Sequence, residues 1–85
     1  MTPTPTDCPC PADVAEDARG LTCPLPLLRL RKALHGMAVG QVVQLQATDP
    51  HSQTDIRRFC EKSGQRLKAA QARDGAFTFW IEKTR

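Results

Sequence analysis

The sequence predicts an α+β fold: a two-layer α/β sandwich in the order β-α-β-α-β-β, with a four-stranded mixed sheet and both helices on one face. Three observations predict it. Apolar residues recur at helical spacing in two segments, residues 24–35 and 49–63. Four short segments alternate apolar and polar residues or are bounded by turn residues, as strands are. Right-handed crossovers would then place both helices on the same face of the sheet.

The N-terminal part divides into a tail and a first strand. The chain has 85 residues, enough for one small domain. Residues 1–12 hold four of its seven prolines, which predicts a flexible Pro-rich tail, with the domain over residues 13–85. Residues 14–18, VAEDA, are the predicted first strand, although acidic residues weaken its apolar pattern. Arg19-Gly20 ends this strand, because glycine tolerates backbone angles that other residues avoid.

The first helix is predicted over residues 24–35. Pro24 suits the first helical position, where a missing N–H costs nothing, and Gly36 suits the position just after the last turn. Leucines at helical spacing define the face that this helix should bury, namely Leu27, Leu30 and Leu34.

A strand is predicted over residues 41–48, QVVQLQAT. Its apolar residues Val43, Leu45 and Ala47 fall on one face, which should turn toward the helices. The other face of the sheet should be solvated, because it would carry Gln44, Gln46, Thr78 and Glu82.

The second helix is predicted from Asp49-Pro50, a capping residue followed by proline, to Ser63, with Gly64 beyond it. Its apolar face consists of Ile56, Phe59 and Cys60. Cys60 on that face should pack in the core, since free cysteine is commonly buried.

The last two strands are predicted over residues 66–73 and 76–83. Asp74-Gly75 between them is a strong signal for a tight hairpin turn. In the last strand Phe77, Phe79 and Ile81 alternate with Thr78, Trp80 and Glu82. Trp80 therefore falls on the solvated face, where we expect it to be partly packed.

Composition narrows the class of protein. The net charge of +3 and the pI near 8.9 are mild, and three Phe and one Trp are few, so no direct nucleic-acid partner is expected. The segment MTPTPTDCPCPAD lacks the basic and apolar regions of a secretory signal. Apolar stretches are too short to span a bilayer, so no membrane partner is expected. These features favour a cytoplasmic protein with reduced cysteines.

The stretch LTCPLP places Cys23 directly before a proline. Cys23 is predicted at the N-cap of the first helix, where the partial positive charge of the helix end favours a thiolate. Pro24 and Pro26 would then occupy positions N1 and N3, stiffening the first turn and leaving the Leu25 amide as the donor nearest the sulfur. Arg19 is a candidate electrostatic helper. The pattern indicates an exposed and partly ionised cysteine.

The sequence pattern places no histidine where it could act as a general base for the Cys23 thiol. His35 lies at the far end of the same helix, about 18 Å from Cys23 by helix rise alone. His51 begins the second helix, but nothing in the sequence supplies an orienting acid or oxyanion hole for it. Pro26 stands where a C-x-x-C pair would have its second cysteine. Such a sulfur suits group carriage, in which it accepts a sulfur atom as a persulfide and hands it on.

The same residues carry a resemblance to a known family. Cys23, Pro24, Leu25 and Pro26 form a C-P-x-P box before a leucine-rich helix, and Asp49-Pro50 with the later Asp55-Ile56 forms a second element. Over residues 16–84 the sequence resembles the TusA/SirA-like sulfur carriers. The resemblance implies a sandwich of the type seen in the C-terminal domain of translation initiation factor three. It also implies a persulfide on Cys23, supported by the motif residues Arg19, Gly20, Pro24, Pro26 and Asp49.

The resemblance implies partners as well. Sulfur would come from a cysteine desulfurase or a rhodanese and pass to a downstream acceptor protein, in tRNA thiolation, molybdenum cofactor supply or sulfur oxidation. No cofactor and no metal site of its own is expected. Two features depart from the family pattern: Glu16 replaces an apolar strand residue, and Cys8-Pro9-Cys10 adds cysteines to the tail.

A partner surface is predicted on the first helix. Leu25 and Leu28 fall away from its buried stripe, so they should be at least partly exposed beside Cys23 and form a docking patch. The alternative is that a loop or the tail covers them. Arg31 and Lys32 on the same helix either are simply solvated or steer acidic partners.

Two other classes of function stay open. An RNA- or protein-binding module without sulfur transfer would fit the fold and the mild positive charge. A thiol-based redox or metal-linked regulator would use Cys8 and Cys10 together with Cys23. A C-x-C pair in a Pro-rich tail, with no matching ligand pair, is more simply a solvated segment.

Overall fold

The computed structural model describes residues 12–85. Six elements follow one another in the predicted order: β1 (Val14–Ala18), α1 (Leu25–His35), β2 (Val42–Ala47), α2 (His51–Ser63), β3 (Arg66–Arg73) and β4 (Ala76–Glu82). Each boundary lies within one or two residues of its predicted place. The predicted tail, apart from Ala12, lies outside the described residues. Neither helix of the described part is long and apolar enough to cross a bilayer.

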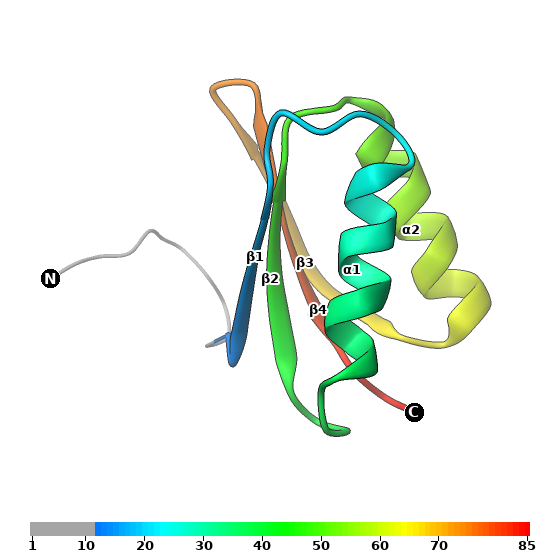
Figure 1. Ribbon diagram of the computed structural model, residues 1–85. Helices are drawn as coiled ribbons and strands as arrows, with labels where there is room; N and C mark the ends of the chain where they lie inside the picture. The colour runs from blue at the N-terminus through cyan, green and yellow to red at the C-terminus, as the bar shows by residue number, and fades with distance from the viewer. Residues whose placement is uncertain (1–11) are drawn as a thin grey trace, which may run out of the picture.

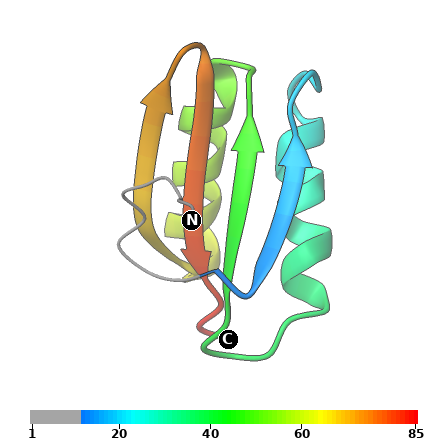
Figure 2. The same ribbon diagram turned by 90° about the vertical axis from the view of Figure 1, so that its left-hand side faces the viewer.

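The sheet has the strand order β1-β2-β4-β3. β1 pairs with β2 in parallel, whereas β4 pairs with both β2 and β3 in antiparallel fashion, so the sheet is mixed. Both helices lie on one face of it (Figure 1), and Figure 2 looks onto the other face, with the strands in front of the helices. The predicted two-layer α+β sandwich is confirmed.

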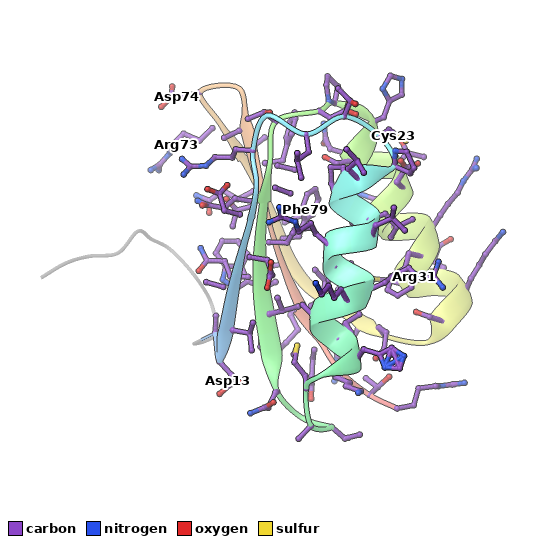
Figure 3. All side chains as sticks on the ribbon, in the orientation of Figure 1. Asp13, Cys23, Arg31, Arg73, Asp74 and Phe79 are labelled. Carbon is purple, nitrogen blue, oxygen red and sulfur yellow. The ribbon has the colours of Figure 1, made fainter. Side chains whose placement is uncertain are left out.

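The core fills the space between the sheet and the helices. Figure 3 shows Phe79 there, reaching from β4 toward the helix layer. Leu27 and Phe59 pack half-buried against this core, on the faces predicted to be buried. Full burial of a large apolar side chain, such as Phe79 or Leu30, stabilises the fold by roughly 1.5–3 kcal/mol. The larger fully or almost fully buried side chains come from both layers: Leu30, Leu34, Val43, Leu45, Ile56, Phe79 and Ile81.

Trp80 lies on the opposite face of the sheet, across from Gln44 of β2 and Ala69 of β3. Its side chain is only 3% exposed, so the predicted partial packing understates its burial. The buried indole Nε1 has no hydrogen-bond partner within residues 12–85.

The turn between β3 and β4 has the predicted tight geometry. Asp74 has φ 52° and Gly75 has φ 77°, so both residues of the turn are left-handed. A two-residue turn of this kind matches the twist of the strands it joins, and Asp-Gly is among the sequences that favour it. The hairpin predicted from this dipeptide is therefore confirmed.

The C-terminal end of α1 is held by Lys83, which lies near the C-terminus of the chain. Gly36 has φ −94°, so it does not form the left-handed cap that its position predicted. Lys83 just after β4 instead donates from Nζ to the carbonyl oxygens of Leu34 at 2.7 Å and Met37 at 2.8 Å. These bonds occupy carbonyls at the helix end and tie α1 to the sheet.

Replacing Lys83 by methionine, which keeps the length of the side chain, should lower the free energy of unfolding by about 1–3 kcal/mol, because two carbonyls lose a charged donor. Urea unfolding measures this loss. The matched control is Lys62→Met on the exposed side of α2, which should change stability by less than about 0.5 kcal/mol. Equal effects of the two substitutions would show that the Lys83 bonds stabilise nothing.

Candidate functional site

Cys23 lies in the connection between β1 and α1, at the edge of the sheet where β1 and β2 both end. Figure 3 shows it at the end of the molecule where the two helices begin. Its side chain is exposed and forms no disulfide, whereas Cys60, the other cysteine of residues 12–85, is free and buried. The exposed position predicted for Cys23 is therefore correct.

The connection leaves β1 through Gly20. This glycine has φ 84°, a left-handed conformation that favours glycine, and its N–H donates to Thr48 Oγ1 at 2.9 Å. Thr48 directly follows β2, so the bond joins the two chain segments that leave neighbouring strands. The strand end predicted at Gly20 is confirmed, and the glycine also brings the Cys23 loop beside the start of α2.

The first turn of α1 lies one residue later than predicted. Pro24 is the N-cap residue and Leu25 is the first helical residue, so Cys23 precedes the cap and Pro26 occupies N2. Pro26 is fully buried, which anchors this turn in the core. The Leu25 N–H donates to the Thr22 carbonyl at 2.8 Å. It is therefore not the donor to the sulfur that its position predicted.

Asp49 connects Cys23 to the start of α2. Its Oδ2 accepts the backbone N–H of Cys23, and its Oδ1 accepts the backbone N–H of His51 at 3.1 Å. The bond from His51, followed by the one from Cys23, lowers the pKa of the Asp49 carboxyl. The N-cap residue of α2 is Pro50, so Asp49 lies one residue before the cap position predicted for it. Its carboxylate still accepts the N–H of His51, the first helical residue, and it directly supports the Cys23 backbone.

His51 has an orienting acid, which the sequence pattern did not supply. Its Nδ1 lies 3.2 Å from Asp49 Oδ1, although the imidazole is 80% exposed. No hydrogen bond joins His51 to Cys23 within the described chain. The prediction that His51 lacks such an acid is therefore wrong. The turn between β2 and α2 sets the Asp49 carboxylate beside the imidazole two residues later.

Asp55 contacts the sulfur of Cys23, and the sequence pattern did not predict this contact. Cys23 Sγ donates to Asp55 Oδ2 at 2.7 Å. Asp55 was singled out only as part of the second element, with Asp49-Pro50 and Ile56. Its place in that second element is the one signal for Asp55 in the sequence. Its contact with Cys23 depends on how the tertiary fold sets α2 beside the start of α1.

The predicted thiolate is wrong for the isolated chain. The hydrogen bond to Asp55 raises the pKa of Cys23 above its ordinary value, and desolvation and the charges of Asp55 and Asp49 add to this. Arg19 does not oppose them, because its guanidinium pairs with Asp17 at 2.9 and 3.0 Å. That pairing, led by the Arg19 side-chain bond, lowers the pKa of Asp17 to about 2.

The exposed face of α1, which follows Cys23 in the chain, carries apolar and basic residues. Leu25 is 44% exposed and Leu28 is 49% exposed, so the predicted exposure is confirmed for both and no described segment covers them fully. Arg31 and Lys32 farther along α1 are exposed as well. A groove between α1 and α2 is lined by Leu27, Arg31, Asp55, Arg58, Phe59, Lys62 and Ser63.

The remaining cysteines divide between the core and the tail. Cys60 is 6% exposed, and burial raises the pKa of its thiol to about 11, which confirms the predicted core position. Cys8 and Cys10, for which a redox or metal role was the alternative, lie outside the described residues. In residues 12–85, no three His, Cys, Asp or Glu side chains gather in a way that would hold a metal ion.

Comparisons with known proteins show what this chain is similar to. The sulfur carrier protein TusA of Allochromatium vinosum is 44% identical over 68 residues, which span 80% of this chain and 90% of that protein. The protein of the same name from Pseudomonas syringae is 39% identical over 71 residues, 84% of either chain. The crystal structure of a SirA-like protein from Desulfitobacterium hafniense matches with a TM-score of 0.75 at 26% identity, covering 85% of this chain and 99% of that one.

The sequence model of the family described as Sulfurtransferase TusA matches residues 17–83. The match includes the C-P-x-P box and the second element, and it agrees with the resemblance over residues 16–84. A binding module without sulfur transfer and a redox or metal-linked regulator are not favoured by these relatives. The chain belongs to the TusA family of sulfur carriers.

Proposed function

We propose that Cys23 is the sulfur-bearing residue of this carrier, and that it accepts a sulfur atom as a persulfide and passes it to a partner. The observation that supports this most is the position of the thiol, exposed before Pro24 and held from two sides by Asp49 and Asp55. Cys60 is buried and offers no access to a partner enzyme.

The chemistry at Cys23 requires partners. In the acceptance step Sγ bonds to the terminal sulfur of a donor persulfide, and the donor's S–S bond breaks. In the delivery step an acceptor takes the same sulfur, and Cys23 returns to the thiol. We propose a cysteine desulfurase or a rhodanese as donor. The acceptor would belong to a relay such as tRNA thiolation, molybdenum cofactor supply or sulfur oxidation.

The carrier residue must be a reduced thiol, and this requirement favours a reducing cellular compartment. We place the carrier in the cytoplasm, where thiols stay reduced. Its sulfur-carrier domain is proposed to span residues 13–85, with Gly20, Pro24, Pro26 and Asp49 shaping the loop around the sulfur. Arg19 acts on this loop through its pairing with Asp17 rather than on the sulfur.

Partners are proposed to dock on α1 beside the sulfur. Leu25 and Leu28 offer apolar area within the first turns of the helix that follows Cys23. Arg31 and Lys32 add positive charge to the same helix, which favours a partner surface with apolar anchors and acidic groups. The groove between α1 and α2 extends this surface, with its cations and with Leu27 and Phe59.

Incubation with a cysteine desulfurase, cysteine and pyridoxal phosphate should add one sulfur atom to the intact chain. Cys23→Ser should abolish this gain and leave the fold intact, because the side chain is exposed. Trypsin cleaves after arginine and lysine, so it separates Cys23 in residues 20–29 from Cys8 and Cys10 in residues 1–19 and from Cys60 in residues 59–62. The added sulfur should appear on residues 20–29.

The controls for this experiment exclude the other cysteines. A variant with Cys8→Ser and Cys10→Ser should still gain one sulfur atom. If desulfurase gives no gain, the same experiment with a rhodanese or polysulfide tests the other donors. Sulfur found only on residues 1–19, or no gain with any donor, would exclude Cys23 as the carrier residue.

Leu28→Asp should slow sulfur transfer from the donor by about tenfold or more, because it puts a charge into the docking patch, equivalent to a loss of about 1.4 kcal/mol. Its free energy of unfolding should change by less than about 0.5 kcal/mol, since the side chain is largely exposed. Val39→Asp is the matched control, as Val39 is 66% exposed in the connection between α1 and β2. Equal slowing by both variants, or a large stability loss in Leu28→Asp, would contradict the docking patch.

A further inference from the structure

Asp55 is held in place independently of the loop that carries Cys23. It lies on α2 next to Ile56, which is fully buried in the core. The start of the same helix is fixed by buried Ser52, whose Oγ donates to the Asp49 carbonyl at 2.6 Å. The carboxylate of Asp55 therefore meets the sulfur from a rigid element, whereas Cys23 sits in a connection between elements.

Both charged groups that hydrogen-bond to Cys23 are carboxylates, while the cations Arg31 and Arg58 line the groove that Asp55 also lines. Asp55 on α2 contacts Sγ, and Asp49 in the turn before α2 contacts the Cys23 backbone. His51 pairs with Asp49, and Arg19 from the β1 side pairs with Asp17. Arg29 on α1 donates to the Asp17 carbonyl. No cation of residues 12–85 forms a hydrogen bond or an ion pair with Cys23 or Asp55, so the sulfur faces two carboxylates.

A carboxylate hydrogen-bonded to a thiol favours the protonated sulfur, yet the nucleophile in sulfur transfer is the thiolate. A neutral acceptor such as asparagine could also take the thiol hydrogen bond, but it would neither hold the proton on the sulfur by its charge nor take that proton up. A carboxylate in hydrogen-bond contact with the thiol is also placed to take its proton when the sulfur reacts.

We propose that Asp55 is the proton-holding partner of Cys23: it keeps the empty carrier a thiol and accepts the thiol proton as the sulfur is loaded. This inference rests on the proposed function of Cys23 and adds a residue to it. Asp55 acts through Cys23, so it is a positioning and proton-holding residue.

The loading step balances with Asp55 in this role. Cys23 Sγ attacks the terminal sulfur of the donor's persulfide, and the new S–S bond forms as the donor's S–S bond breaks. The electron pair of the broken bond leaves on the donor's cysteine, which is reduced to a thiolate, while Cys23 is oxidised to the persulfide. The thiol proton passes to the Asp55 carboxylate and from there to solvent, and the terminal sulfur keeps its own proton.

Loading also changes the contact between the two residues. The inner sulfur of a persulfide carries no proton, so it no longer donates to Asp55. A terminal sulfur that ionises is repelled by the carboxylates of Asp55 and Asp49. The loaded side chain therefore turns away from α2, whereas the empty thiol is held toward it.

The test is the pH dependence of alkylation at Cys23. Wild type and Asp55→Asn are pulsed with iodoacetamide across the pH range, and label on residues 20–29 is counted by mass spectrometry, separately from the other cysteines. Asp55→Asn should shift the midpoint of the profile down by about one pH unit, which makes the thiol about tenfold more reactive at neutral pH. Circular dichroism checks that each variant is folded.

Two further variants make the result specific. Glu61→Gln removes the same charge from an exposed position on α2 and should leave the midpoint unchanged. Asp55→Glu should restore a high midpoint, because it returns a carboxylate to the same turn. Should Asp55→Asn not fold, Asp55→Ser serves the same comparison.

Sulfur loading by the donor is measured on the same variants. This measurement distinguishes a failure of the role of Asp55 from a failure of the proposed function of Cys23. The pH profile of loading should move down with that of alkylation in Asp55→Asn. An alkylation midpoint that stays in place or rises in Asp55→Asn, or that moves equally in Glu61→Gln, overturns the role of Asp55 even where wild-type Cys23 takes up sulfur. Absence of sulfur on wild-type Cys23 instead refutes the proposed function.

Discussion

The parallel pairing of β1 with β2 is the constraint on which the site depends. Parallel strands end at the same edge of a sheet, and the register sets Ala18 opposite Ala47 as the last pair. Both alanines are fully buried beneath the helices, so core packing fixes this register. The chain therefore leaves both strands side by side, and the connection to α1 brings Cys23 within reach of Asp49.

Local patterns were sufficient to predict the fold and the exposure of Cys23. Period-two alternation in β2, leucines at helical spacing in α1 and the Asp74-Gly75 turn each depend on residues close in sequence. The first turn of α1 was placed one residue too early because Cys23 and Pro24 both fit a cap position. Asp55 and Lys83 were missed for another reason: their contacts join segments 32 to 49 residues apart, and no local pattern encodes them.

The state of the thiol depends on which charges lie closest to it. The N-terminal end of a helix acts as roughly half a positive charge, and this, with Arg19 as a candidate helper, predicted a thiolate at Cys23. Asp55 brings a whole negative charge into hydrogen-bond contact, and Asp49 adds a second one nearby. The nearer and larger charges decide the outcome, so the pKa of Cys23 rises. The thiolate prediction failed because the tertiary fold added charges that the helix alone does not have.

A carrier must present its sulfur and yet distinguish its two states. Pro26 is buried in the same turn from which Leu25 projects into solvent, so the backbone around Cys23 is fixed while its outer face stays open to partners. A fixed backbone shows donor and acceptor the same surface whether or not sulfur is bound. With Cys23 as the proposed sulfur-bearing residue, the difference between the empty and the loaded carrier then lies at its side chain. The bond from Sγ to Asp55 supplies such a difference, because it requires the proton that the persulfide's inner sulfur lacks.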